Sequence, residues 1–307
     1  MGRLRASAII KDILTRALAP SHALNWLDRR RRHKRSPTVR ANTQLNLYSQ
    51  ILPGDFLHYG YFDDASVEPE AVSLRNVEQA QLRYAEKILE LIRMPDAPVL
   101  DVGCGMGGFL GLLRDRGYDP VGVTPDRFQI QHIAESYPGI PVHHCKFEEM
   151  PIEQARQVFG TVIHSESLQY MDPDGVFRVL REVLAPGGTW IVADYFRVDR
   201  EGERSGWPWQ RFLERLEQHG YRRVHEEDIT SHVLPTLAFA HLLGTRFGLP
   251  VYDFACDKLR TKAPATHYVL ENLAQRGRES VLKNLAVVDP ERFSRTKRYM
   301  LLALQAG

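Results

Sequence analysis

The sequence predicts an α/β protein whose core is a doubly wound, mostly parallel sheet of seven strands. Two observations carry this prediction. From about residue 98 onward, short apolar runs typical of buried strands alternate with longer segments whose apolar residues recur at helical spacing. The first apolar run also breaks directly into a glycine-rich loop, from Val99 to Gly108, as expected where a strand passes into its crossover helix. The chain has 307 residues, which is enough to bury such a core and carry additions around it.

The alternation places each element of the core in turn, and proline and glycine mark the boundaries. Gly117 ends the first crossover helix and Pro138 follows the second. Asp172, directly before Pro173, is the predicted N-cap of the third. The turn at 186–188 leads into the fifth strand. We expect strands at about 98–103, 119–124, 141–147, 160–165, 189–195, 222–229 and 298–304. We expect helices at about 109–116, 127–136, from 173 onward, and at 208–219. Before the core, helices are expected at about 1–20 and 70–93.

Helical additions are expected on both sides of this core. The predicted division is an N-terminal helical extension and covering segment at 1–95, a core at 96–230, a helical insertion at 231–290 and a final core strand at 291–307. A last strand that returns after so long a helical stretch is typical of an insertion over a ligand site. The apolar run from Val233 to Leu243 then predicts a lid helix, with a helix buried against the core as the alternative.

The charge of the chain is distributed unevenly. The net charge is +2, yet residues 1–40 hold eleven Lys or Arg against Asp12 and Asp28, a local balance of +9 that leaves about −7 for the remainder. This pattern gives no indication of a nucleic-acid enzyme. For the basic run from Arg29 to Arg35 we favour a solvated helix and linker or a helix on a second subunit. Peripheral membrane contact through this basic N-terminus and a homo-oligomer stay open.

Cysteine usage and hydropathy indicate a reducing, cytoplasmic setting. The three cysteines are far apart and form no C-x-x-C pair, so we predict neither a disulfide framework nor a metal site. No apolar run approaches the length of a membrane span, and no signal-peptide pattern is present.

The glycine loop predicts a nucleotide-like cofactor. Gly103, Gly105 and Gly107 allow sharp turns and close backbone approach to a ligand, and the following helix can hold an anion at its N-terminus. With Gly108, the spacing also satisfies the dinucleotide pattern G-x-G-x-x-G, so the glycines alone do not separate a nicotinamide cofactor from S-adenosylmethionine. Asp101 favours the second, because a cofactor with an ammonium and a sulfonium benefits from a nearby carboxylate.

In this acid and glycine motif the chain resembles the class I S-adenosylmethionine-dependent methyltransferases, which have a Rossmann-like core. The resemblance implies that Gly103 and Gly105 line the methionine part of S-adenosyl-L-methionine, with Asp101 supporting the loop or the ammonium. The usual acid after the second strand is absent, since the chain reads Gly-Val-Thr at 122–124. That variant resembles the cyclopropane fatty acid synthase relatives, and the resemblance implies that Thr124 and Gln129 face the cofactor. The alternative is that Thr124 or Asp126 caps the following helix.

Two further segments are compared with this family of small-molecule and lipid methyltransferases, of which the first matches and the second departs at one residue. Leu57 to Phe62 is similar to the His-x-Gly-Tyr segment of the tocopherol and sterol enzymes, which implies Tyr61 beside the cofactor and His58 and Tyr59 on the substrate side. Lys146 replaces the acid that usually reads the adenine amine. Phe147 and Glu148 are therefore the residues that we expect at the adenine.

The end of the fourth strand supplies the catalytic candidates. In a doubly wound sheet, the carboxyl ends of the strands face the ligand, which makes the polar residues Ser165 and Glu166 site candidates by position. Glu166 is the first choice as general base and His164 the second, while a helix-capping carboxylate and a core histidine are their alternatives. Ser165 is assigned to the cofactor and Tyr59, like His58, to catalysis.

The chain departs from the cyclopropane synthases at the residues that hold their bicarbonate base. It has Tyr59 and the pair Gln169-Tyr170 where those enzymes have a cysteine and a Glu-His pair, so methyl transfer is preferred over cyclopropanation. A C- or an O-methylated isoprenoid, lipid or natural product is expected, and the faces of Tyr59, Tyr170 and Tyr195 could stabilise a carbocation. A NAD-dependent oxidoreductase and a non-catalytic cofactor-binding or membrane-associated scaffold are the alternatives.

Overall fold

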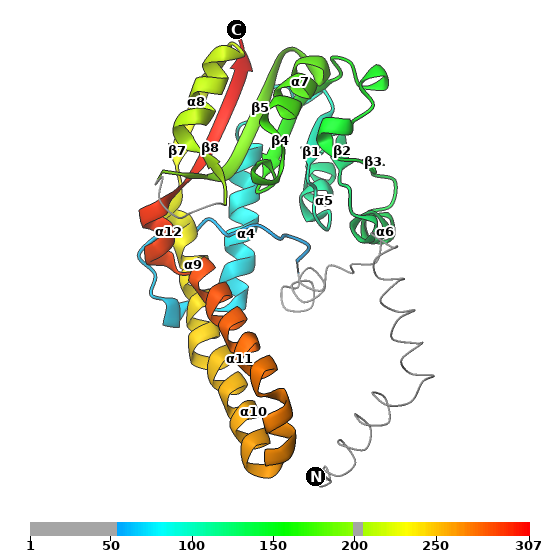
Figure 1. Ribbon diagram of the computed structural model, residues 1–307. Helices are drawn as coiled ribbons and strands as arrows, with labels where there is room; N and C mark the ends of the chain where they lie inside the picture. The colour runs from blue at the N-terminus through cyan, green and yellow to red at the C-terminus, as the bar shows by residue number, and fades with distance from the viewer. Residues whose placement is uncertain (1–53, 199–204) are drawn as a thin grey trace, which may run out of the picture. The chain divides into compact units, whose positions relative to one another are not determined.

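A computed structural model describes residues 54–198 and 205–307 (Figure 1). Within these residues the chain forms two compact units, one of residues 54–239 and 290–307 and the other of residues 240–289. The helix expected at 1–20 and the basic run of the N-terminal extension lie outside the described residues.

The larger unit contains the predicted sheet. Seven strands follow the order β3-β2-β1-β4-β5-β8-β7, and the short strand β6 pairs with β5 beside this path. β8 is antiparallel to both of its neighbours, whereas the strands from β3 to β5 are parallel. The strands are β1 (Val99–Val102), β2 (Pro120–Val123), β3 (Val142–His143), β4 (Phe159–Ser165), β5 (Leu184–Arg197), β6 (Trp207–Pro208), β7 (Tyr221–Asp228) and β8 (Lys297–Ala306). The predicted fold class is thereby confirmed.

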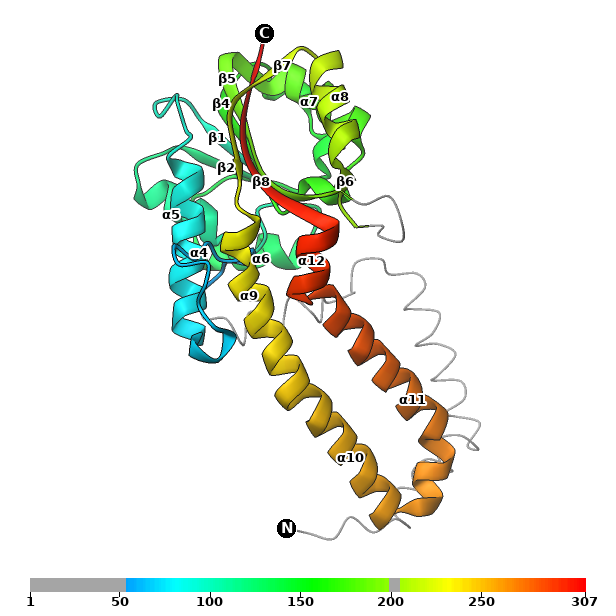
Figure 2. The same ribbon diagram turned by 90° about the vertical axis from the view of Figure 1, so that its left-hand side faces the viewer.

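Helices cover both faces of this sheet. Figure 2 shows α7 and α8 on one face and α4 and α5 on the other, as the doubly wound arrangement requires. The helices of this unit include α4 (Leu74–Leu89), α5 (Gly108–Asp115), α6 (Arg127–Ser136), α7 (Pro173–Val183), α8 (Trp209–Gln218) and α12 (Pro290–Thr296). Short 3-10 turns lie at η2 (Pro69–Ala71), η3 (Phe147–Glu149), η4 (Ile152–Gln154) and η5 (Leu168–Tyr170).

Two element boundaries differ from the sequence prediction for identifiable reasons. α4 begins four residues later than the expected residue 70, because Ser73 and Asn76 form a reciprocal capping box at its N-terminus. The edge strand β3 stops at His143 instead of continuing to 147. The chain leaves the sheet there and buries the ring of Phe147 in the core.

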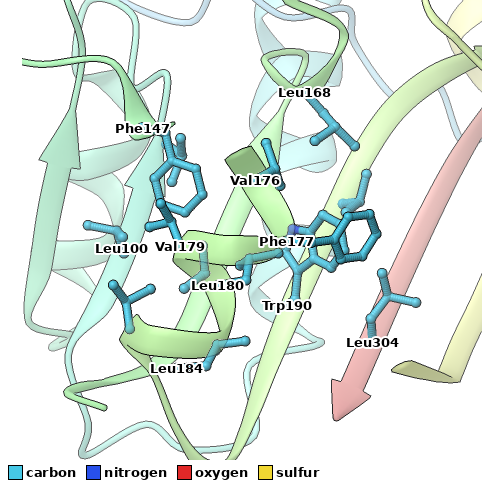
Figure 3. Packing of buried hydrophobic residues seen from close by; sticks show 14 of the residues in the cluster. Leu100, Phe147, Leu168, Val176, Phe177, Val179, Leu180, Leu184, Trp190 and Leu304 are labelled. Carbon is cyan, nitrogen blue, oxygen red and sulfur yellow. The ribbon is translucent and has the colours of Figure 1, made fainter. Parts of the chain in front are cut away.

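The main core lies between the sheet and α7 and α8. Trp190 of β5 and Phe177 of α7 meet edge to face with ring centroids 5.4 Å apart, and both are fully buried (Figure 3). His164 belongs to this core, since the indole Nε1 of Trp190 donates a hydrogen bond to its Nδ1 at 3.0 Å. Burial lowers the pKa of His164 to about 3, so the imidazole stays neutral. The core alternative for His164 is therefore the one that the structure supports.

The smaller unit is helical, as expected for the insertion. α9 (Thr230–Leu243) passes through the π turn η6 (Gly244–Gly248) into α10 (Leu249–Lys262), and α11 (Pro264–Val287) returns antiparallel beside α10 (Figures 1 and 2). The hydroxyl of Tyr252 donates to the carbonyl of Ala274 at 2.7 Å across the pair. None of the helices in the described residues is both long enough and apolar enough to cross a membrane.

Candidate active site

The site begins where β1 passes into the glycine loop. Asp101 pairs in register with Gly122 of β2 and Ile163 of β4, which places it in the middle of the sheet. The carboxyl is 3% exposed, and burial raises its pKa to about 7. Burial is the only cause acting on this pKa, so no donor or cation among the described residues offsets the cost of ionising Asp101. A cationic ligand group beside it would supply that compensation, which fits the ammonium of S-adenosylmethionine.

The loop itself needs glycine for its backbone and for the space around it. Gly103 has φ +79°, and a Cβ built there would lie 2.5 Å from the Cβ of Ser167. The hydroxyl of Ser167 donates to the carbonyl of Val102 at 2.5 Å, which ties the segment after β4 to the end of β1. The loop and the segment that carries Glu166 are therefore held against each other.

We expect Gly103→Ala to destabilise the protein by about 2 to 4 kcal/mol, because the new methyl group meets a fixed neighbour as well as an unfavourable φ. Gly117→Ala is the matched control. Gly117 has a similar φ of +86° but nothing lies within 4 Å of its built Cβ, so only about 1 kcal/mol is expected. Urea unfolding of the two variants measures the difference, and equal losses would contradict the close packing described here.

The aromatic segment, residues 56–62, packs against this loop. Its backbone is fixed by the side-chain amide of Gln81 in α4, which donates to the carbonyls of Phe56 and His58 at 3.1 and 2.8 Å. A Cβ on Gly105 would lie 3.3 Å from the side chain of Leu57, which places the two segments in contact. α4 therefore positions the aromatic segment at the mouth of the glycine loop.

Tyr61 and Gly60 connect the same segment to α9. The ring of Tyr61 stacks on His232 with centroids 4.3 Å apart, and the amide of Gly60 donates to Thr236 Oγ1 at 3.0 Å. His232 also donates from Nδ1 to the carbonyl of Phe62 at 2.7 Å. Tyr61 is thus buried against α9 and α4, and its contact with the cofactor stays a prediction.

The residues predicted to face the cofactor and its adenine follow β2 and β3 in the chain, with Gln129 in α6 and Phe147 and Glu148 in η3. Thr124 donates from its hydroxyl to Gln129 Oε1 at 2.5 Å, so the structure brings this predicted pair together. Phe147 is fully buried and meets the ring of His164 edge to face. Glu148 accepts the backbone N–H of Asp172 at 2.9 Å, which leaves its carboxylate engaged at the start of α7.

Glu166 occupies the centre of the predicted catalytic cluster. Its backbone has φ +50°, an uncommon conformation for this residue type, and its amide donates to the carbonyl of Ala193 at 2.9 Å. Its Oε1 accepts the backbone N–H of Tyr59 at 2.7 Å and the hydroxyl of Tyr299 at 2.8 Å. Burial raises the pKa of Glu166 to about 7, although both hydrogen bonds lower it.

A chain of hydroxyl groups leads away from Glu166. The Tyr299 and Tyr84 hydroxyls are 2.8 Å apart, and Tyr84 also donates to the carbonyl of Ala193 at 3.0 Å. Ser165, which we predicted at the cofactor, lies 3.2 Å from the Tyr84 hydroxyl through its Oγ. This arrangement fixes the tyrosines around the carboxylate.

A second buried carboxyl lies near Glu166. Burial raises the pKa of Asp194 to about 8, with the charge of Glu166 as a further cause. Asp194 accepts the amides of Tyr195 and Gln169, at 2.8 and 3.3 Å. Because each added charge disfavours the other, the pair holds a proton at neutral pH.

Aromatic rings surround this carboxyl pair. Tyr59, Tyr195 and Tyr299 come from three different segments, and Phe293 of α12 lies within 6.2 Å of the first two. The ammonium of Lys297, which is buried, lies 4.2 Å from the centroid of the Tyr195 ring. The cluster combines π faces with a single basic carboxylate. Tyr170, the third ring named from the sequence, is 81% exposed.

His58 is less suited than Glu166 to accept a proton. Its Nδ1 donates to the carbonyl of Tyr59 at 2.8 Å, its ring stacks on Tyr84 at 4.2 Å, and burial lowers its pKa to about 4. Its Nε2 is buried without a hydrogen-bond partner among the described residues. A general base works best with a pKa near the working pH, which favours Glu166.

Tyr299→Phe tests the link between the tyrosine and the carboxylate. The hydroxyl lowers the pKa of Glu166, so its removal raises that pKa. In a plot of the rate of methyl transfer against pH, the rise that follows ionisation of Glu166 should then move to higher pH by about one unit. Tyr84→Phe, which leaves the contact to Glu166 in place, is the control and should shift the limb less. The pH dependence of the rate measures both, and an unmoved limb in Tyr299→Phe would contradict the assignment.

The residues of the site that were missed in the sequence include Tyr84, Asp194, Phe293, Lys297 and Tyr299. Asp194 stands at the carboxyl end of β5, so the positional rule that singled out Glu166 applies to it as well. β8 runs antiparallel to β5, which brings its beginning, with Tyr299, to that same edge opposite Tyr195. Tyr84 carries no such signal, because a tyrosine in an amphipathic helix is ordinarily a core residue.

Comparisons with known proteins define the class of this domain. The family model of the methyltransferase domain matches residues 77–233, half of the chain. The chain is 27% identical over 162 residues to the 2-methyl-6-phytyl-1,4-hydroquinone methyltransferase of Synechocystis, covering 50% of this chain and 49% of that protein. The chain thus spans about half the length of this relative.

Solved structures share the fold at low sequence identity. The [4+2]-cyclase SpnF superposes with a TM-score of 0.60 at 20% identity, covering 86% of this chain and 94% of SpnF. Geranyl diphosphate C-methyltransferase from Streptomyces coelicolor, solved with S-adenosyl-L-homocysteine, gives a TM-score of 0.54 at 17% identity, covering 81% and 89%.

The chain belongs to the methyltransferase domain family. The resemblance predicted from the acid and glycine motif is confirmed, and S-adenosyl-L-methionine is the cofactor that the family match supports. The comparisons give no support to the nicotinamide alternative. Asp101, the glycine loop and the Thr124–Gln129 pair are the residues that would hold the cofactor.

Proposed function

We propose that this protein transfers a methyl group from S-adenosyl-L-methionine to a small apolar or amphipathic acceptor, such as an isoprenoid, a lipid or a natural product. The observation that carries the proposal is a buried carboxylate, Glu166, with a pKa of about 7 among aromatic rings. The shared fold leaves the reaction open, since one of the similar structures is a cyclase. The reaction class therefore rests on the residues of the site.

The aromatic surroundings favour an apolar acceptor. The ring of Phe293 lies within 6.2 Å of the rings of both Tyr59 and Tyr195, and the ammonium of Lys297 lies against the Tyr195 and Phe293 rings. Such faces bind apolar carbon skeletons and would stabilise positive charge that develops on an alkene. The relatives are consistent with this class, because their names specify a phytyl hydroquinone and geranyl diphosphate as substrates.

Glu166 is the residue that we assign to proton removal. When bound, the cofactor supplies a methyl group activated by its sulfonium. The acceptor must then lose one proton as its new bond to carbon forms, and the Glu166 carboxylate can take it. The backbone N–H of Tyr59 and the hydroxyl of Tyr299 hold that carboxylate in one orientation.

The remaining residues position and enclose the reactants. A transfer of this kind needs the acceptor atom at about 3 to 3.5 Å from the methyl carbon and the exclusion of water. The aromatic segment contacts the glycine loop through Leu57 and Glu166 through Tyr59, so it links the proposed cofactor and acceptor sides.

The test is transfer of label from methyl-labelled S-adenosyl-L-methionine into a host-cell extract, followed by partition between organic and aqueous phases. We expect label in the organic phase with the wild type and none with Asp101→Ala. Label confined to the aqueous phase would contradict the apolar acceptor. Cofactor binding with no transfer to any fraction would favour the scaffold or a different reaction.

A further inference from the structure

The helical unit of residues 240–289 exposes large apolar side chains. Phe247, Phe254 and Leu273 are 64%, 65% and 68% exposed, and Val251 and Val269 are similarly exposed. Single apolar residues on a surface are ordinary, but a contiguous group of this size usually marks a binding surface. We call these five residues the apolar face.

Two contacts between α10 and α11 show which side of each helix faces the other helix. The Tyr252 hydroxyl bonds to Ala274, so Tyr252 marks the inner side of α10. Asp253 and Arg278 form an ion pair at 2.8 Å, which marks one flank of the helix pair. Tyr252 and the Asp253–Arg278 ion pair thus fix two directions around the helix axes. At 3.6 residues per turn, the directions of the other side chains follow from their positions in the sequence.

The apolar face lies on the flank opposite that ion pair. Val251 precedes Asp253 by two residues, and Leu273 precedes Arg278 by five. Both offsets place the side chain nearly half a turn away from the ion pair. Phe247 and Phe254 are spaced at i−4 and i+3 from Val251, and Val269 lies at i−4 from Leu273, so each extends the same stripe. The five residues of the apolar face therefore lie along one flank of the α10–α11 pair, while Tyr268 and Leu282, which are also exposed, lie nearer to the ion pair.

Basic and acidic side chains also lie on different flanks of the α10–α11 pair. By the same helical offsets, basic residues share the apolar flank: Lys258, Lys262, Arg276 and Lys283. The acidic residues Asp253, Asp257 and Glu271 lie on the ion-pair flank, and Glu279 falls at the outer edge of α11. The ammonium of Lys258 lies 5.7 Å from the centroid of the Phe254 ring, which places a cation directly beside an exposed aromatic side chain.

This charge pattern indicates which kind of partner can bind the apolar face. A second copy docked by the same face would bring the lysines of the two faces together, which opposes association. Residues 1–40, with a balance of +9, would meet the same repulsion. Apolar and aromatic side chains mixed with Lys and Arg instead complement an anionic lipid surface, into whose interface such a helix inserts side-on.

We propose that the apolar face of α10 and α11 binds the surface of an anionic membrane. Phe247, Phe254 and Leu273 enter the boundary between headgroups and acyl chains, while Lys258 and Arg276 contact lipid phosphates. This assigns the unit a role that does not depend on the reaction at Glu166.

Co-sedimentation of the full-length protein with vesicles tests the proposal. We expect binding to vesicles of phosphatidylcholine with phosphatidylglycerol, and much weaker binding to phosphatidylcholine alone. Phe247→Ser with Phe254→Ser should lower the partition coefficient by about tenfold or more. Both residues are exposed, so this variant should keep its fold, which circular dichroism and an unchanged affinity for S-adenosyl-L-methionine verify.

A matched pair of charge variants distinguishes an effect of the apolar face on vesicle binding from an effect of the protein's net charge. Lys258→Glu lies on the apolar flank and should lower vesicle binding by about tenfold. Arg260→Glu changes the net charge equally, two residues away on the ion-pair flank, and should bind like the wild type. Equal losses in both, or none in either, would overturn the proposal. The proposal would also be overturned if the wild-type protein did not bind vesicles but formed a dimer that the double variant Phe247→Ser with Phe254→Ser dissociated.

Discussion

Asp101→Asn is expected to weaken binding of S-adenosyl-L-methionine by about a hundredfold and, at the same time, to stabilise the free protein. The substitution keeps the size of the side chain and removes its charge. Loss of one partner from a buried ion pair typically costs about 3 to 5 kcal/mol. The loss of affinity therefore follows if the carboxylate faces the cofactor's ammonium.

The gain in stability follows from the pKa of Asp101 in the free protein. Folding raises that pKa from 3.8 to about 7, so between these values the folded state binds more protons than the unfolded state. Stability contributed by the protonated carboxyl is present at low pH and is lost as the pH rises through 7. Asparagine cannot ionise, so the variant should lack this loss and melt several degrees higher than the wild type at pH 8.

Two measurements check this pair of effects. Isothermal titration gives the cofactor affinity, and thermal unfolding from pH 5 to 8 without cofactor gives the stability. Asp115→Asn, an exposed carboxyl on α5, is the control and should change neither. A variant that both binds normally and melts lower would show that Asp101 has a structural role only.

Glu166→Gln is expected to reduce kcat by about a thousandfold with little change in cofactor affinity. The amide oxygen can still accept from Tyr59 and Tyr299, so the local structure should persist, whereas the amide cannot take a proton. Proton transfer by a positioned base contributes about 10² to 10⁴ in rate. The size of the loss therefore reports directly on the role of the carboxylate.

The pH profile distinguishes a base from a structural carboxylate. In the wild type the rate should rise with pH as Glu166 ionises, with its midpoint near 7. Glu166→Gln should lack this limb at every acceptor concentration. A variant with full activity and the wild-type profile would remove Glu166 from the chemistry.

Much of the fold was predictable because each element carries a local signal. The buried run at β1, the glycine loop and the caps at Asp126 and Asp172 are specified by adjacent residues. The boundary of β3 was not, since it depends on where the ring of Phe147 is buried. The 3.6-residue period also indicated the helices of the insertion, yet it gave no information on which side of α10 packs against α11.

The candidate site was predicted in part. Glu166 and the glycines follow from their position at strand ends. The structure joins Thr124 and Gln129 by a hydrogen bond, and their contact with the cofactor stays a prediction. Tyr299 reaches Glu166 across 133 positions of sequence, through the antiparallel pairing of β8, and no pattern in one sequence specifies that contact. His164 shows the opposite case, because its position suggested a site and its partner Trp190 places it in the core.

Direct binding of cofactors to the wild-type protein tests the central claim most simply. Titration with S-adenosyl-L-methionine should give saturable binding at one site, and titration with NADH should give none. The same titration at pH 6 and pH 8 should show tighter binding at pH 8, where Asp101 is ionised before the cofactor arrives. Saturable binding of NADH, without binding of S-adenosyl-L-methionine at either pH, would contradict the assignment of the site.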